Sequence, residues 1–214
     1  MRSWLVDLVA VGRDLLTALL PGTCPGCGRR GEPCCARCRP GLTPAPHAPP
    51  PPGVDWWVAP YAYDGVVREL VAHTKYRAAR SSIRWLAEAV AAACPAQPVD
   101  VVTWPPASVA RLRAHGVDHA GLLARAVARH LDRPVRPLLD RMPGPAQTGA
   151  SWAQRRAGPQ LRALQSVRGM NVLIVDDVAT TGATLTAAAR ALRDQGAATI
   201  GAATATRTPL PRRA

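Results

Sequence analysis

Phenylalanine is absent from this 214-residue sequence, tyrosine occurs three times, and the six tryptophans are scattered except for Trp56-Trp57. A stacking platform for single-stranded nucleic acid is therefore poorly supported. Acidic residues are also few: 14 Asp and Glu stand against 27 Lys and Arg, and Lys75 is the single lysine. The net charge of +13 favours a polyanion or a phosphate compound as partner. The 48% hydrophobic content fits a globular domain with a small appendage and excludes disorder throughout and collagen.

A long uninterrupted apolar run is missing as well. In residues 1–20, Asp7, Arg13 and Asp14 break the apolar stretch, which is shorter than the ~7–15 residues of an export signal core. It is also shorter than the ~20 residues that span a bilayer. The apolar residues instead recur at helical spacing, so we expect an amphipathic helix over residues 1–20, docked in a cytoplasmic protein without a membrane span.

Five of the six cysteines fall within fifteen residues, whereas Cys94 stands alone. This clustering favours a metal site over the spaced disulfides of a secreted protein. Residues 21–39 contain two C-x-x-C pairs, which could supply four thiolates to one structural Zn²⁺. The alternative is a redox pair, which two such motifs argue against. The predicted ligands are Cys24, Cys27, Cys35 and Cys38, with Cys34 able to replace Cys35.

The chain changes character at a proline-rich segment. Seven of the thirteen residues from Pro40 to Pro52 are proline, which predicts an extended linker over residues 40–53. Residues 54–208 then alternate apolar runs with helical patterns, which is typical of an α/β domain with a parallel central sheet; residues 209–214 form a basic tail. We expect strands at 99–104, 134–139, 171–176 and 198–204, and helices at 64–73, 82–93, 118–130 and 183–195.

The most informative stretch begins with the apolar run 172–175, which predicts a central strand covered on both faces. Asp176 and Asp177 follow, then a threonine-rich bend with one glycine, then a helix. Such a bend presents backbone N–H groups, hydroxyls and a helix N-terminus to an anion. A ribose 5-phosphate would place its phosphate there and donate its hydroxyls to the carboxylates. The predicted phosphate-binding residues are Val178, Ala179, Thr180, Thr181, Gly182, Ala183 and Thr184.

Three other interpretations compete with this one. A receiver domain is excluded, because only 37 residues follow Asp177. A Walker B strand is weakened by the lack of a G-x-x-x-x-G-K-[ST] motif upstream. The third is a polar turn that binds nothing. The phosphate hypothesis requires an open bend whose amide hydrogens are not already bonded within the protein.

The strand, the acidic pair and Thr-Thr-Gly-x-Thr resemble the phosphoribosyl pyrophosphate (PRPP) motif of type I phosphoribosyltransferases. The paired cysteines, Tyr63-Asp64-Gly65, Lys75-Tyr76-Arg77 and Arg111-Leu-Arg113-Ala-His115-Gly116 narrow the resemblance to the ComF family. It implies a Rossmann-like phosphoribosyltransferase fold after a helix and a zinc-ribbon-like module. It also implies that Asp176 and Asp177 are catalytic and bind the ribose hydroxyls, with Mg²⁺. Trp104-Pro105-Pro106 and Val117-Asp118-His119 depart from the family's Pro-x-Pro and Phe-Asn-Gln.

A set of basic residues and prolines provides candidates for the pyrophosphate end of such a site. Residues 141–158 have the composition of a mobile lid over an anion. Each arginine taken alone could equally be a solvated surface charge. The candidates for the pyrophosphate site and the lid are Pro105, Pro106, Lys75, Arg77, Arg111, Arg113, Arg155 and Arg156.

Two functions follow from these patterns. The first is a phosphoribosyltransferase that binds PRPP or a related ribose 5-phosphate or nucleotide and transfers phosphoribose to an acceptor. The second, which the ComF resemblance implies, is a non-catalytic accessory of DNA uptake in competence, which contacts single-stranded DNA and a helicase. The sequence leaves the acceptor open.

Overall fold

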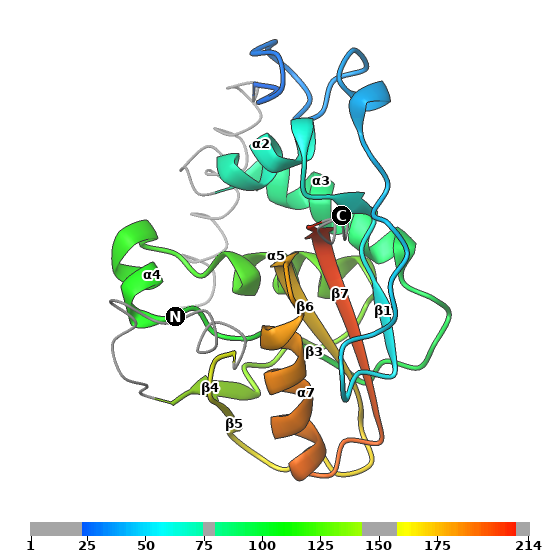
Figure 1. Cartoon of the computed structure of the whole chain (residues 1–214), viewed down its shortest axis with the longest axis vertical. Helices are drawn as coiled ribbons and strands as arrows, with labels where there is room; N and C mark the ends of the chain where they lie inside the picture. Colours follow the sequence, from blue (N-terminus) through cyan, green and yellow to red (C-terminus); the bar gives the residue numbers. More distant parts are fainter. Residues whose placement is uncertain (1–22, 75–79, 143–157, 209–214) are drawn as a thin grey trace, which may run out of the picture.

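The computed structural model describes residues 23–74, 80–142 and 158–208. Within them, five parallel strands form a sheet in the order β1-β7-β6-β3, and β2 continues along the edge of β7 that β1 occupies (Figure 1). The parallel sheet expected from the apolar runs is confirmed. Its strands are β1 (Trp56–Val58), β2 (Tyr61–Ala62), β3 (Val101–Thr103), β6 (Asn171–Ala179) and β7 (Thr199–Arg207).

Strand β6 is central, as its apolar sequence predicts, because β7 and β3 flank it. Its side chains alternate between two cores: Leu173 and Val175 pack in one, Val172 and Ile174 in the other. Helices α2 (Gly65–His73), α3 (Arg80–Ala93) and α5 (His119–His130) cover the first face. Helix α7 (Ala183–Asp194) covers the second. The sheet is thereby shielded on both sides, which fixes its carboxyl edge as the place for a site.

The four predicted helices agree with these bounds to within two residues at each end. The structure adds α4 (Val109–His115), which the sequence patterns did not predict. Ser108 caps it, its side chain accepting a hydrogen bond from the Arg111 N–H, and Gly116 ends it in a left-handed conformation with φ 69°. Helix α4 stands out from the body of the domain (Figure 1). With seven residues it makes about two turns, which is too short for a helical repeat of apolar residues to be detected in the sequence.

The predicted strand at 134–139 is wrong. Only Val135 forms a bridge, to Val102 of β3, and the chain then enters β4 (Leu139–Arg141). Strand β4 pairs antiparallel with β5 (Leu161–Ala163) in a separate two-stranded sheet. The reason is chemical: Pro134 and Pro137 have no N–H to donate to a ladder.

The proline-rich segment is extended, yet it lies against the domain. After the 3₁₀ turn η1 (Arg39–Gly41), the Thr43 carbonyl accepts from the Ala62 N–H at 2.8 Å, and the Ala45 N–H donates to Pro60. Further along, Pro51 is buried against Gly182. These contacts tie the segment to both β2 and the bend after β6.

Two predicted segments, the helix at 1–20 and the tail at 209–214, lie outside the described residues. Among the helices of the described ranges, none is long and apolar enough to cross a membrane.

Candidate functional site

The acidic pair lies within β6 itself, because the strand runs three residues beyond its predicted end, to Ala179. The Asp177 N–H donates to Asp176 Oδ1 at 2.9 Å, and the Val178 N–H donates to Asp177 Oδ1 at 2.8 Å. Burial raises the pKa of Asp176 well above its ordinary value, and the neighbouring Asp177 carboxylate raises it further, whereas Arg111 opposes the shift. A carboxylate pair in this state is stabilised by hydroxyl donors or a cation.

The two carboxylates have different neighbours. Asp177 borders a small cavity between α2, α3 and α5, together with Thr74 and His119. Asp176 instead interacts with the guanidinium groups of Arg111 and Arg141. The pair therefore connects two parts of the carboxyl edge of the sheet.

The bend after β6 is open, as a phosphate site requires. Thr180 and Thr181 are exposed, and the Ala183 N–H donates to Thr181 Oγ1 at 3.3 Å. No hydrogen bond within the described ranges uses the N–H of Thr180, Thr181, Gly182 or Thr184. The bend thus presents unpaired amide hydrogens at the N-terminus of the twelve-residue α7, which is where an anion is stabilised.

Gly182 shapes this bend through its backbone. Its φ is 75°, in the left-handed region, and a Cβ at this position would lie 3.0 Å from Pro51 Cγ. A side chain here would be strained and would press on the proline-rich segment. The glycine in the motif is therefore required both by the turn and by the close approach of Pro51.

The candidate pyrophosphate end follows β3. Pro105 is buried and Pro106 half-buried, and the Pro106 carbonyl accepts a hydrogen bond from Arg141 Nε at 3.1 Å. Burial lowers the pKa of Arg141, as does the charge of Arg111, while Asp176 and Asp118 raise it. Arg141 thus joins the loop after β3 to the acidic pair.

Trp104 and Asp118, which the sequence analysis singled out as unusual, contact each other. Trp104 Nε1 donates to Asp118 Oδ2 at 2.8 Å, while Asp118 Oδ1 accepts from the Gly121 N–H and caps α5. The Arg125 guanidinium stacks over the Trp104 ring at 4.8 Å, and a Cβ on Gly121 would lie 2.9 Å from Trp104 Nε1. The two unusual residues form one interlocked unit beneath the loop.

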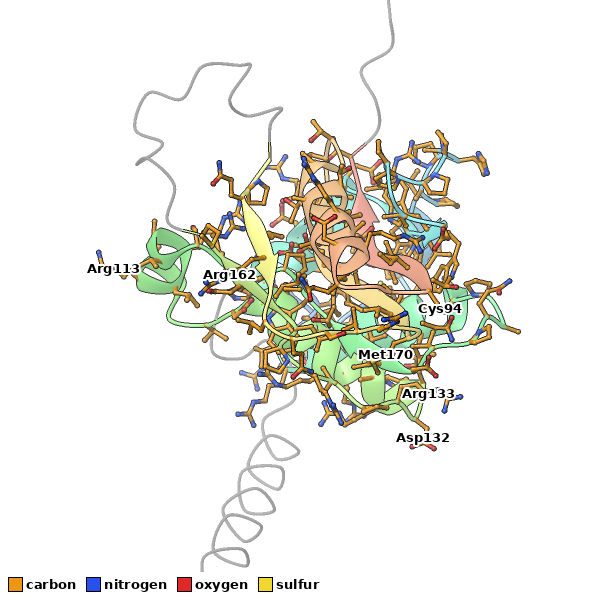
Figure 2. The ribbon with its side chains drawn as sticks, turned by 90° about the horizontal axis from the view of Figure 1, so that it is seen from below. Cys94, Arg113, Asp132, Arg133, Arg162 and Met170 are labelled. Carbon is orange, nitrogen blue, oxygen red and sulfur yellow. The ribbon has the colours of Figure 1, made fainter. Side chains whose placement is uncertain are left out.

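The predicted basic residues do not all meet. Arg111 interacts with Asp176 from α4, but Arg113 on the same helix is exposed and points away from the domain (Figure 2). Lys75, Arg77, Arg155 and Arg156 lie outside the described residues. Sequence reasoning placed Arg141 only within a lid, whereas it belongs to β4. It missed Arg207, an arginine that ends an apolar strand.

The predicted zinc ligands come together. Sγ atoms of Cys24, Cys27, Cys35 and Cys38 all lie within 4.8 Å of one another. Four sulfurs around one Zn²⁺, each at about 2.3 Å, would be about 3.8 Å apart, so the cluster fits this ion. Cys34 is buried but is not part of the cluster.

Matching turns build the two halves of the cluster. The Cys24 carbonyl accepts from the N–H groups of Cys27 and Gly28, and the Cys35 carbonyl accepts from those of Cys38 and Arg39. Although burial acts to raise it, backbone hydrogen bonds from Cys35 and Gly26 lower the pKa of Cys24 to about 6. A stabilised thiolate is the form that binds a metal.

The cysteine module contacts the α/β domain through small residues. A Cβ on Gly26 would lie 3.1 Å from Val66 Cγ1 of α2 and 3.2 Å from Cys38 Sγ. A Cβ on Gly41 would lie 3.9 Å from Val66 Cγ2. The turns that carry the cysteine cluster therefore pack closely on α2.

Comparison with known proteins gives one family match. The model of the phosphoribosyl transferase domain matches residues 116–212, which include α5, β6, the bend, α7 and β7. No curated protein matches the chain.

Solved structures with a similar arrangement include an allosteric regulatory enzyme of purine biosynthesis (25% identity, 59% of this chain, TM-score 0.42). The glutamine PRPP amidotransferase from B. subtilis, complexed with ADP and GMP, is 25% identical over 58% of this chain, with a TM-score of 0.41. This chain covers 26% of the length of each of these two. A purine phosphoribosyltransferase from Pyrococcus horikoshii Ot3 is 20% identical, covering 62% of this chain and 75% of that chain, with a TM-score of 0.38.

These overlays assign no residue roles. The domain match includes the acidic pair and the open bend, and the strands around them form a parallel sheet. The chain therefore contains a phosphoribosyltransferase-like α/β domain, preceded by a four-cysteine cluster.

Proposed function

We propose that this chain binds PRPP, or a related ribose 5-phosphate compound, and transfers the phosphoribosyl group to an acceptor. The observation that carries the proposal is the open bend, with four amide N–H groups that have no partner in the described protein, directly after an acidic pair. A phosphate accepts hydrogen bonds from such N–H groups, and ribose hydroxyls donate hydrogen bonds to carboxylates. One ligand satisfies both halves of the site.

Binding would relieve the electrostatic cost within the pair. Asp176 is half-buried and lies next to Asp177, so hydroxyl donors from the 2′ and 3′ positions would stabilise both charges. Thr180 and Thr181 are exposed and can donate their hydroxyls to the 5-phosphate. Mg²⁺, when bound with PRPP, would neutralise part of the charge of the pyrophosphate.

Transfer would begin at C1 of the ribose. The bond from C1 to the pyrophosphate oxygen breaks, and its electron pair leaves with the pyrophosphate, which makes the sugar oxocarbenium-like. Arg111 and Arg141 stabilise the departing charge from the side of Asp176. A lone pair of the acceptor then forms the new bond to C1, and the acceptor loses its proton to solvent.

Calorimetry with Mg²⁺ and PRPP tests this function. Saturable binding is expected for the wild type, and the double variant Thr180→Ala/Thr181→Ala should bind at least about tenfold more weakly, because two hydroxyl donors are lost. The matched control is Thr199→Ala, because Thr199 begins β7 at the end of the sheet away from the bend. Release of pyrophosphate with candidate acceptors tests the transfer step. Absence of saturable PRPP binding by the folded wild type would refute the proposal.

We further propose that the chain is a member of the ComF family, that it is located in the cytoplasm, and that its cysteine cluster holds a structural Zn²⁺. An alternative function, as a DNA-uptake accessory that contacts single-stranded DNA and a helicase, is favoured by the net charge of +13 and by the exposed Arg111 and Arg113 on the protruding α4. It requires DNA binding that weakens steeply as salt increases. A flat salt dependence would exclude that alternative and leave the PRPP proposal intact.

A further inference from the structure

A second hollow lies on the opposite edge of β7 from β6. It has a volume of about 300 Å³ and lies between the proline-rich segment, β1 and the end of α3. We call it the Arg207 cavity. The residues that matter for its chemistry are Pro46, His47, Trp57 and Arg207.

Arg207 is the unusual member of this cavity, because its side chain is buried without a counter-ion among the described residues. It is 5% exposed. Across the described part of the chain, no carboxylate lies within ion-pair distance of its guanidinium. Burial lowers its pKa, and no acidic group opposes that shift. Burying a charge without a partner is costly, so such a group is normally paired.

The contacts of Arg207 satisfy only part of its guanidinium. Nη1 donates to the Pro46 carbonyl at 2.6 Å, and the group stacks over the Trp57 ring at 5.2 Å. Trp57 is itself fixed, because its Nε1 donates to Thr204 Oγ1 at 3.3 Å. A guanidinium has five N–H donors, of which one donates to the Pro46 carbonyl, and Arg207 also lines the cavity.

We propose that the Arg207 cavity binds a small organic anion through a carboxylate or phosphate group. Guanidinium groups bind both anions in a bidentate manner. The exposed imidazole of His47 adds a second donor on the cavity wall. A volume near 300 Å³ is at the lower end for ligand pockets, so the ligand is a small molecule.

This site is distinct from the sugar-phosphate site and does not depend on it. Arg207 pairs with Ala179 across the strands, but its side chain contacts Pro46 and Trp57 rather than the bend. Only Gly182 of the bend lies against the proline-rich segment, at Pro51, further along the chain than Pro46. Loss of PRPP binding would therefore leave this proposal standing, and the reverse also holds.

The test follows the indole N–H resonance of Trp57 in ¹⁵N-labelled full-length protein, assigned by its absence in Trp57→Phe. The protein carries Thr180→Ala/Thr181→Ala, so that phosphate bound at the bend does not interfere. Inorganic phosphate and acetate are titrated separately, with sodium chloride at equal ionic strength as control. Their relative affinities show which anion the cavity prefers.

We expect a saturable shift of the Trp57 resonance with at least one of the two anions and none with chloride. Arg207→Met should weaken binding by about tenfold or more, because charge-assisted hydrogen bonds are lost. His47→Ala, at an exposed position, should weaken it by a smaller factor and keeps the test possible if Arg207→Met does not fold. Arg133→Met, on an exposed arginine that does not line the cavity, is the control.

A Trp57 resonance that does not move with phosphate or acetate overturns the proposal. So does a shift of equal affinity in the Thr180→Ala/Thr181→Ala protein with and without His47→Ala or a folded Arg207→Met. A Trp57 shift that occurs in the wild type and is lost in the Thr180→Ala/Thr181→Ala protein would assign the anion to the bend and also contradict the proposal.

Discussion

The two ends of the candidate site are built in different ways. At the ribose end, Asp176, Asp177 and the bend lie within nine consecutive residues of one strand–bend–helix unit. At the pyrophosphate end, the loop after β3 meets Arg111 of α4 and Arg141 of β4, and the bond from Arg141 to Pro106 joins residues 35 apart in sequence. One end is set by local chain geometry and the other by tertiary packing.

This difference separates their roles in binding. A locally built anion site holds the common part of every ribose 5-phosphate ligand. An end assembled from three elements can change with its neighbours, and here Trp104 and Asp118 contact each other. Substitutions at the two ends should therefore respond differently to ribose 5-phosphate and to PRPP.

Asp177→Ala should have the largest effect and should not distinguish the two ligands. Loss of the acceptor for ribose hydroxyls is expected to weaken both ribose 5-phosphate and PRPP by about 100-fold, the size of charged hydrogen bonds. Calorimetry with each ligand measures this. Asp140→Ala, an exposed carboxylate on β4 that pairs with Arg162, is the control. An effect on PRPP alone would contradict the assignment of Asp177 to the ribose.

Arg141→Met should distinguish the ligands. Because Arg141 is half-buried beside Asp176 and Pro106, its loss is expected to weaken PRPP by about tenfold and ribose 5-phosphate very little. The matched control is Arg162→Met, on the paired strand β5, where the guanidinium is exposed (Figure 2). Equal weakening of both ligands would remove Arg141 from the pyrophosphate end.

Asp118→Ala should act mainly on stability. It removes the cap of α5 and the acceptor for Trp104 Nε1, which should lower the free energy of unfolding by about 1–2 kcal/mol. Asp118→Asn keeps an acceptor and should retain most of the stability. Ser108→Ala removes a cap on α4 without a tryptophan contact. Denaturant unfolding that gives the same loss for Asp118→Ala and Ser108→Ala would show that the Trp104 contact contributes nothing.

Substitution in the cysteine cluster should have the smallest effect on ligand affinity. Cys24→Ser removes one of four thiolates, so the zinc content of the purified protein should fall from about one per chain. Cys34→Ser, at a buried thiol outside the cluster, should retain the metal. Elemental analysis and PRPP calorimetry on the same samples check both effects. Full zinc content in Cys24→Ser would contradict the assigned ligand set.

The sequence predicted the central strand and the bend after it because the signals there are local. An apolar run on both faces, an acidic pair and a glycine in a threonine-rich bend are each visible within a few residues. The cysteine cluster was predicted for the same reason. The carboxyl edge of the sheet followed from the alternation of strands and helices.

The pyrophosphate end could not be predicted in the same way. Trp104 and Asp118 each looked like a defect in a pattern, and only the fold shows that one donates to the other. Arg141 was assigned to a lid because a three-residue strand is too short to show an alternation of apolar and polar residues. The antiparallel pairing of β4 with β5 therefore gave no signal in the sequence. Arg207 gives no signal at all until the proline-rich segment is seen against β7.

The packing of Pro51 on Gly182 has a consequence for how the bend is formed. Prolines restrict the conformations of the unfolded chain, so less entropy is lost when this segment folds. Ordering the segment beside the bend after β6 therefore costs less entropy than ordering a segment without prolines. Replacing Pro51 with glycine would remove the ring atoms that lie against Gly182 and would restore the freedom of the unfolded segment, so the bend should become less well ordered.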